Sequence, residues 1–327
     1  MNKSRTTFLI AEILLAILTI FLVRNIFSIE KPQKRVAVIV ENSGDERWDT
    51  FINGMKQAAD LHNIHLIICN TDEIEDAQEE RSLIYEQLDN NIDALIIQAA
   101  PGYDVSEILE EVSVEKPVIL VANDALTREI EEDIQATSRF PRVMPDNYKM
   151  GYELGRELLR KNENDIKGKT VGIVSGVADT DSAKKRQRGL EDALDGSDCE
   201  IRWRVNAVYD QSIGTMVKEQ ERVDFIAVLE TGVLERLGEM TVDESLQGAL
   251  LYGISSSTKG VYYLDAGIIE SLVMADEYDM GYYSVVEISR VLEHNLYAIQ
   301  NHTIDLKILH KEDIFTEENQ KFLHAYE

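Results

Sequence analysis

The fold is decided by residues 35–60, which read RVAVIVENSGDERWDTFINGMKQAAD. The continuous apolar run Val36–Val40 is typical of a parallel strand that is buried on both faces of a sheet. After a polar loop, apolar side chains return at helical spacing, at Phe51, Met55 and Ala58. A buried strand followed by an amphipathic helix predicts the start of a β-α-β unit.

The same rhythm continues along the chain. Three more apolar runs follow, with helical patterns between them, at His65–Cys69, Ala94–Gln98 and Val118–Val121. The rhythm breaks near Phe140–Pro145 and then restarts. Helices are expected over residues 148–159 and 183–194, and strands over 170–174, 201–208, 225–229 and 249–253. Two such sets predict an α/β protein with two doubly wound, parallel-sheet lobes and a ligand cleft at the carboxyl ends of the strands.

The composition fits two globular domains and excludes several classes of protein. The 327 residues are 44% apolar, which is enough to fill two hydrophobic cores. Asp and Glu outnumber Lys and Arg by 60 to 33, and the resulting net charge of -27 repels nucleic acid. Cys69 and Cys199 are too few for a disulfide framework and too far apart for a paired zinc motif. We therefore expect neither a nucleic-acid partner nor a metal or other cofactor.

The amino-terminal segment has the character of a membrane helix. Residues 8–23 read FLIAEILLAILTIFLV, and only Glu12 and Thr19 interrupt the apolar run. A helix over residues 8–27 would span about 30 Å at about 1.5 Å per residue, which matches the hydrocarbon core of a bilayer. The segment offers no small-x-small cleavage site, so we expect an uncleaved anchor, with a cleaved signal peptide as the alternative. Residues 1–35 are then an N-terminal membrane anchor and linker.

Motifs for catalysis are missing from the sequence. Ser182 and Lys185 match the S-x-x-K pattern of penicillin-recognising enzymes, but no S-D-N or K-T-G element follows. His62, His65 and Cys69 have a passable metal spacing, but two of them fall within a predicted strand and no fourth ligand is evident. No P-loop or G-x-S-x-G elbow occurs either. We therefore do not expect an enzyme.

Five stretches, taken in order, carry a family resemblance. They read RVAVIVENSGDERWDTFINGMKQAAD, DNYKMGYELGRELL, GKTVGIVSG, SAKKRQRGLEDAL and LDAGIIESLVMADEYDMGY. Together they resemble the type I periplasmic binding proteins, and most of all the ribose- and galactose-binding branch. The resemblance implies a periplasmic-binding-protein-like I fold whose chain crosses between the lobes three times at a hinge. Lobe one would comprise residues 36–144 and 276–303, and lobe two residues 145–275 and 304–327.

The resemblance also implies a function. It suggests an extracytoplasmic, membrane-anchored solute-binding protein that closes on a small polar, sugar-like ligand and delivers it to an ABC transporter. The alternative is a ligand-sensing accessory protein that signals to a membrane histidine kinase or chemoreceptor without transport. Basic residues lie on both sides of the apolar segment, so the expected outward orientation comes from the resemblance rather than from charge.

Candidate ligand contacts follow the predicted strands. A sugar needs an aromatic face to stack on and polar groups that bind its hydroxyls. Trp48 is the stacking candidate, and Arg186 falls where the ribose-binding branch carries a sugar-binding arginine, three residues before Gly189. The full set is Glu46, Arg47, Trp48, Gln98, Asn123, Asp124, Arg186, Glu230, Ser255 and Asp276.

The second lobe departs from the sugar-binding pattern of the branch. Glu230 stands where the branch has an Asn-Asp pair, Ser255 where it commonly has Asp, and Ala275 where it often has Gln or Asn. Glu46, Glu230 and Asp276 are candidates to replace these contacts. They would give an acidic cleft that suits a polyol, an amino sugar or another cationic solute.

Overall fold

The protein is described by a computed structural model. The described residues are 12–20, 32–72, 74, 76–101, 105–125, 138–162, 166–176, 180–206, 213–242 and 246–324. The chain divides into two compact units, Met1–Gln33 and Lys34–Glu327, and residues 12–20 of the first unit form a helix. Within the described part of the chain, no helix has the length and apolar character needed to span a bilayer. The rest of the expected anchor, residues 8–11 and 21–27, lies outside the described residues, so the anchor stays a prediction.

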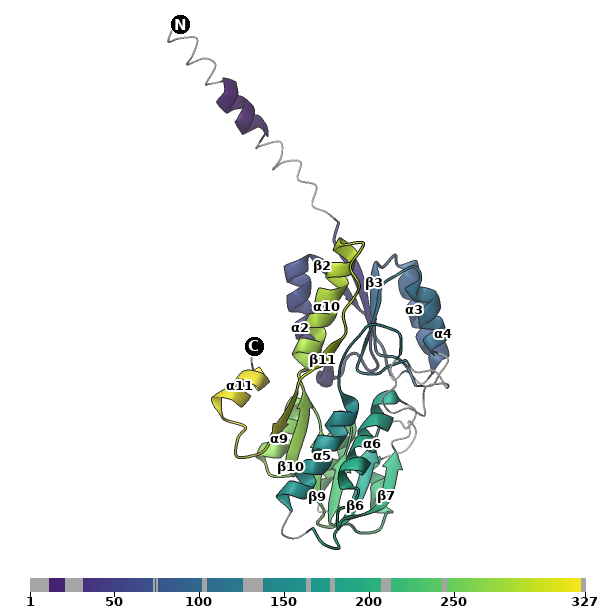
Figure 1. Ribbon diagram of the computed structural model, residues 1–327, viewed down its shortest axis with the longest axis vertical. Coiled ribbons are helices and arrows are strands. Elements are labelled where there is room, and N and C mark those ends of the chain that lie inside the picture. Colours follow the sequence, from purple (N-terminus) through teal and green to yellow (C-terminus); the bar gives the residue numbers. More distant parts are fainter. Residues whose placement is uncertain are drawn as a thin grey trace. The chain divides into compact units, whose positions relative to one another are not determined.

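The described part of the second unit is built on two sheets (Figure 1). The strands of the first sheet are β1 Lys34–Ile39, β2 Ile64–Ile68, β3 Ala94–Ile97, β4 Val118–Val121, β5 Arg142–Pro145 and β11 His302–Ile304. Those of the second are β6 Thr170–Ser175, β7 Glu200–Asn206, β8 Phe225–Val228, β9 Leu250–Ile254, β10 Ile269–Ala275 and β12 Leu306–Leu309. The strand orders are β11-β5-β4-β3-β1-β2 and β12-β10-β9-β8-β6-β7. We call the first sheet with its helices lobe 1 and the second lobe 2.

The pairings within both sheets are parallel, except that β12 runs antiparallel to β10. In the middle of the first sheet, Val38 lies opposite Ile96 of β3 and Ile68 of β2. The expected α/β fold with two parallel-sheet lobes is confirmed. Strands β5, β11 and β12 were not expected, because three or four residues are too few to carry a periodic signal. Strand β10 was also missed, because Glu270 and Ser271 interrupt its apolar run.

Helices cover both faces of each sheet. Lobe 1 carries η1 Glu46–Trp48, α2 Asp49–His62, α3 Ala77–Asp89, α4 Val105–Ser113 and α10 Glu277–Glu293. Lobe 2 carries α5 Asn147–Lys161, α6 Asp181–Leu194, α7 Ile213–Lys218, α8 Thr231–Val242, α9 Thr258–Asp265 and α11 Glu317–His324. Successive strand residues point to opposite faces. Val38 therefore packs in the cluster of α2 and α10, whereas Ile39 packs with α3 and α4 on the other face (Figure 1).

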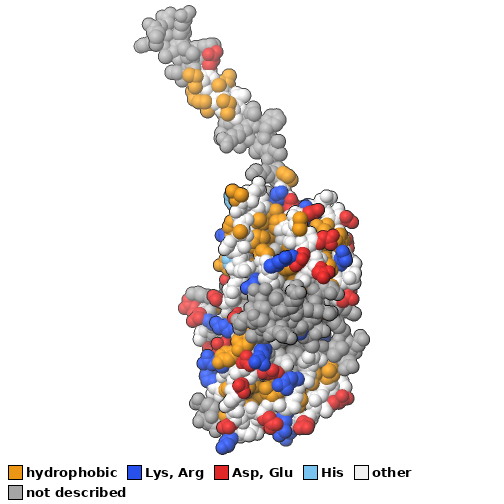
Figure 2. Space-filling view, turned by 45° about the vertical axis from the view of Figure 1, so that its right-hand side comes forward, with side chains coloured by type: hydrophobic (Ala, Val, Ile, Leu, Met, Phe, Trp, Pro, Cys, Tyr) orange, Lys and Arg blue, Asp and Glu red, His pale blue; other side chains and the backbone are white. Residues whose placement is uncertain are grey.

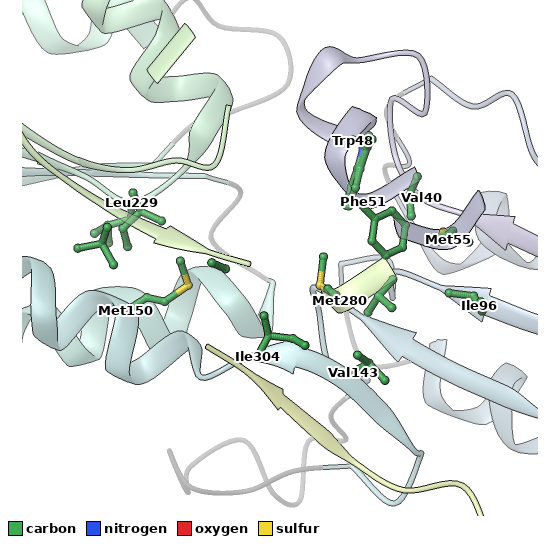
Figure 3. Packing of buried hydrophobic residues seen from close by; sticks show 14 of the residues in the cluster. Val40, Trp48, Phe51, Met55, Ile96, Val143, Met150, Leu229, Met280 and Ile304 are labelled. Carbon is green, nitrogen blue, oxygen red and sulfur yellow. The ribbon is translucent and has the colours of Figure 1, made fainter. Parts of the chain in front are cut away.

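The chain passes between the lobes three times, where β5 leads into α5, β10 into α10 and β11 into β12. The first two crossings share the pattern D-x-Y-x-M-G-Y, at residues 146–152 and 276–282. In each, the aspartate accepts a hydrogen bond from a backbone N–H in the first turn of the helix and so caps it. Met150, Met280 and Ile304, one from each crossing, belong to one apolar cluster that runs through both lobes (Figure 3). The expected limits of the two lobes as separate domains stay a prediction.

Helices α2 and α10 of lobe 1 meet at glycines. A Cβ on Gly54 would lie 2.1 Å from the carbonyl oxygen of Tyr278, and a Cβ on Gly281 would lie 2.0 Å from that of Phe51. Real side chains do not tolerate such distances, so both positions need glycine. The close contact fixes where α10 begins relative to α2.

Helices α5 and α6 of lobe 2 meet in the same way. A Cβ on Gly151 would lie 1.8 Å from the carbonyl oxygen of Arg186, and a Cβ on Gly189 would lie 2.0 Å from that of Tyr148. Gly151 and Gly281 occupy the same position of the D-x-Y-x-M-G-Y pattern. The repeated pattern therefore encodes a helix contact in each lobe, and in lobe 2 that contact places Arg186.

Charge is spread over the surface of the second unit. On the face shown in Figure 2, acidic and basic side chains are interspersed over both lobes. Some surface charges of this unit are paired, such as Arg204 with Glu191 at 2.6 Å and Arg188 with Asp192 at 3.1 Å. Neither sign of charge dominates the described part of this face.

The glycine contact gives the first prediction. Gly281→Ala places a Cβ against the Phe51 carbonyl oxygen, so α2 and α10 must separate, and we expect the free energy of unfolding to fall by about 1–3 kcal/mol. Gly232 also lies in a helix, but a Cβ there would meet nothing within 4 Å. Gly232→Ala should therefore stay within about 0.5 kcal/mol of wild type. Urea denaturation followed by tryptophan fluorescence measures both, and equal stability of the two variants would contradict the close contact.

Candidate ligand-binding site

A cavity of about 210 Å³ lies between the lobes. Its walls include residues that come one or two positions after parallel strands, namely Gln98 after β3, Asn123 after β4 and Glu230 after β8. Open α/β sheets bind their ligands at this place. The volume is below the roughly 300–1,000 Å³ of pockets for drug-sized ligands, so the cavity fits a small solute.

The structure brings six of the ten candidate residues to this cavity. They are Arg47, Trp48, Gln98, Asn123, Arg186 and Glu230. The other four lie outside its lining. Glu46 is exposed, while Asp124 accepts hydrogen bonds from two backbone N–H groups of its own loop. Ser255 bonds to Ser257 and Asp276 caps α10, so these polar groups organise loops and helix ends.

The wall from lobe 1 is organised by Glu41, a residue that the sequence did not single out. Arg47 Nη2 donates to Glu41 Oε1 at 3.1 Å, and Gln98 both accepts from the Glu41 backbone N–H and donates to Oε1. Trp48 Nε1 donates to the Glu41 carbonyl at 2.9 Å. The indole is only 5% exposed, and the Arg47 guanidinium lies 5.3 Å from its ring centre. Trp48 thus forms part of the wall and offers less free aromatic face than expected.

The wall from lobe 2 is organised by Arg186. Its Nε donates to Asn147 Oδ1 at 2.8 Å, and its Nη1 donates to the Leu229 carbonyl and to Glu230 Oε2, both at 3.0 Å. The guanidinium is therefore held by three partners from α5 and from the end of β8. Because the planar guanidinium is held in place, its N–H donors have fixed directions relative to the cavity.

The lobes also touch directly at one side of the cavity. Ser182 Oγ, in the first turn of α6, donates to Asn123 Oδ1 of lobe 1. The carboxylate of the neighbouring Asp181 accepts a hydrogen bond from the Asp124 backbone N–H. Burial raises the pKa of Asp181, and Lys185, at 3.0 Å, opposes the shift. These contacts join the lobes in the arrangement that the structure describes.

Besides Glu41, three charged residues that line the cavity were missed at the sequence level, namely Asp45, Arg236 on α8 and Glu277 at the start of α10. Burial raises the pKa of the Glu277 carboxyl to about 7, although a hydrogen bond from Ser256 and the nearby Arg47 and Arg186 favour its charged form. The signal that could have found Glu277 is its place in the D-x-Y-x-M-G-Y pattern. No such signal marks Arg236.

Among the described residues, the three acidic candidates do not gather in the cavity. Glu46 and Asp276 lie outside the lining, and Glu230 is paired with Arg186. Among the described residues, the lining contains four acidic and three basic side chains, namely Glu41, Asp45, Glu230, Glu277, Arg47, Arg186 and Arg236. This near balance suits a neutral polar ligand better than a cationic one.

Arg186 gives the second prediction. Arg186→Met removes three hydrogen bonds and leaves the Glu230 carboxylate without its partner, so we expect a loss of about 1–3 kcal/mol in the free energy of unfolding. Arg188 lies on the same helix, but it is exposed and paired with Asp192 at the surface. Arg188→Met should change stability by less than about 0.5 kcal/mol. Chemical denaturation measures the difference, and an unchanged Arg186→Met protein would contradict the bonded geometry.

Comparison with known proteins agrees with this architecture. The chain matches the periplasmic binding protein domain family over residues 36–295. No relative was found among curated proteins. Among solved structures, a carbohydrate transporter solute-binding protein from Agrobacterium radiobacter in complex with D-arabinose matches with a TM-score of 0.77 and 14% identity, covering 89% of this chain and 99% of that chain.

Two further structures show the same fold. GanP, a glucose-galactose binding protein from Geobacillus stearothermophilus, matches with a TM-score of 0.73 and 20% identity, covering 88% of this chain and 100% of that chain. A chain from the complex of the TorS sensor domain with TorT, in the absence of ligand, matches with a TM-score of 0.70 and 19% identity, covering 89% and 96%. Because the family match spans most of its length, this chain belongs to the periplasmic binding protein domain family, whose members are binding proteins rather than enzymes.

Proposed function

We propose that this chain is a membrane-anchored, extracytoplasmic solute-binding protein that closes on a small, sugar-like ligand and delivers it to an ABC transporter. The observation that carries the proposal is the small polar cavity between the lobes, with Arg186 on one side and the Glu41–Arg47–Gln98 group on the other. Membership of a family of binding proteins supports it.

The chemistry of the cavity favours a ligand with hydroxyl groups. A hydroxyl both donates and accepts hydrogen bonds, and the walls offer guanidinium donors beside carboxylate and amide acceptors. Arg186 with Glu230, and Arg47 with Glu41, each present both kinds of group within about one hydrogen-bond length. Two of the structural neighbours are described as a D-arabinose complex and a glucose-galactose binding protein, which also supports a monosaccharide.

The crossings offer a hinge for closure of the lobes. Three chain segments connect the lobes, and Met150, Met280 and Ile304 fill the space between them (Figure 3). Methionine side chains are unbranched and adapt to a changing shape, so such a cluster tolerates a change in the angle between the lobes. The bond from Ser182 to Asn123 would then form on closure and break on opening.

Tethering to the membrane rests on the apolar segment of residues 8–27. Delivery of the ligand to a permease would use the surfaces of both lobes, because only their closed arrangement signals that the cavity is occupied. We place the folded unit outside the cytoplasm on the resemblance to binding proteins that work there.

A second candidate is a sensory role without transport. In it, closure on the ligand is read by a neighbouring membrane histidine kinase or chemoreceptor. The likeness to a chain from a complex that contains the TorS sensor domain favours this candidate. Neighbouring genes distinguish the two, since permease and ATPase genes accompany transport, whereas kinase and response-regulator genes accompany sensing.

Ligand binding gives the third prediction. In full-length protein in detergent, Trp203→Phe leaves Trp48 of the cavity wall as the sole tryptophan. Titration with D-arabinose, D-glucose and D-galactose should change its emission saturably for at least one sugar. Sugar at about 100 times Kd should stabilise the protein by about 2.7 kcal/mol and raise Tm by several degrees.

The matched variants Arg186→Met and Arg188→Met provide the control in the same background. The first should lose the rise in Tm, because it loses a cavity donor, and the second should keep it. If none of the three sugars alters either emission or Tm of the protein, the proposal of a monosaccharide ligand is wrong.

A further inference from the structure

The repeated pattern at two crossings places different residues in equivalent positions. Asn147 is the first residue of α5, and Glu277 is the first residue of α10. Each follows the capping aspartate of its D-x-Y-x-M-G-Y motif. Both residues therefore occupy the same place in the backbone at the start of a helix. A difference between the hydrogen bonds of their side chains then points to different roles at the cavity.

The side-chain amide of Asn147 forms hydrogen bonds within the protein through both its oxygen and its nitrogen. Its Oδ1 accepts from Arg186 Nε at 2.8 Å, and its Nδ2 donates to the Ala122 carbonyl at 3.3 Å. The residue is 3% exposed. It ties α5 to Arg186 on one side and to the loop after β4 on the other, which is a structural role.

The Glu277 carboxyl has a hydrogen-bond partner for only part of its bonding capacity. Ser256 bonds to its carboxyl group, but its buried Oε2 has no hydrogen-bond partner. Arg47 and Arg186 are close enough to favour its charge, yet neither forms an ion pair with it among the described residues. The Nε of Arg47 is likewise buried without a hydrogen bond, and its ion-pair contact with Asp45 Oδ2 is long, at 4.0 Å. Arg47 and Glu277 both line the cavity. The cavity wall therefore contains one donor, Arg47 Nε, and one acceptor, Glu277 Oε2, that form no hydrogen bond with any described residue.

A buried polar group without a partner destabilises a protein by roughly 1–3 kcal/mol, and such groups are rare in folded proteins. When the group faces a cavity, a ligand can complete its bonding. We propose that Glu277 is a ligand contact, and that its Oε2 accepts a hydrogen bond from a hydroxyl of a neutral polyhydroxylated ligand while Arg47 Nε donates to the same ligand. This inference rests on the proposed binding function and names a contact that recognises the ligand.

Binding through Glu277 depends on pH. Its carboxyl is faced by Arg47, Arg186, Asp276 and Ser256, and its pKa lies at about 7 because of burial. The ligand hydroxyl bonds to the ionised form, which the two arginines favour. The ionised fraction falls from about nine-tenths at pH 8 to about one-tenth at pH 6, so Kd should rise by about tenfold over this range.

The first test needs no ligand and uses the full-length protein in detergent. The pKa of Glu277 is raised on folding, so the buried carboxyl increasingly destabilises the protein as pH rises from about 4.5 through 7. Glu277→Gln should therefore have a higher Tm than wild type at pH 8, by about 2 °C or more, and the same Tm near pH 5. Glu277→Ala should be no less stable than wild type at pH 8. Asn147→Ala, at the equivalent position, should lower Tm at both pH values.

The second test measures D-arabinose, D-glucose and D-galactose binding by isothermal titration calorimetry. For a sugar that binds wild type, Glu277→Ala should weaken binding by about tenfold or more, and Glu277→Gln should abolish the pH dependence between pH 6 and 8. Unchanged affinity with an unchanged pH profile in both variants would overturn the role of Glu277 while leaving the proposed function intact. A fall in the apo Tm of Glu277→Ala as large as that of Asn147→Ala would also overturn it. Failure of all three sugars to bind wild type would instead overturn the proposed function, and the ligand role of Glu277 with it.

Discussion

The whole binding site depends on helices that touch at glycine. Gly151 brings α5 against the backbone of Arg186 itself, and Gly281 brings α10 against Phe51, three residues after Trp48. These contacts set the positions of the Arg186 guanidinium and of the Glu277 carboxyl, which both line the cavity. A larger residue at either glycine would move a wall of the cavity together with the helix. The same pattern at two crossings thus brings helices together and places residues that line the cavity.

Charge within the cavity is arranged in pairs that leave little net charge but many directed polar groups. Arg186 is bonded to Glu230, and Arg47 to Glu41, so most of the charge is satisfied inside the protein. Glu277 differs from these pairs, since its buried Oε2 has no hydrogen-bond partner among the described residues. The unsatisfied carboxyl is the kind of group through which a ligand can stabilise the closed lobes.

The sequence predicted the two sheets because buried parallel strands leave continuous apolar runs, as at Val36–Val40. It did not predict β5, β11 or β12, whose three or four residues carry no periodic pattern. The sequence pointed to polar residues after the strands as ligand contacts, but only some of these residues line the cavity. Asp124, Ser255 and Asp276 bond to nearby loop and helix-end groups instead, and short polar side chains do so readily. The pairing of Arg186 with Glu230 joins residues far apart in the sequence, which no local pattern reveals.

The central claim is that a ligand in the cavity holds the two lobes together across three crossings. Double electron–electron resonance tests it most directly, with spin labels at the exposed Gln78 of lobe 1 and Thr215 of lobe 2 in a Cys69→Ala, Cys199→Ala background. A bound monosaccharide should narrow the distribution of label distances and shift it to shorter values. A sugar that binds with measurable affinity yet leaves the distribution unchanged would show that the ligand does not hold the lobes together.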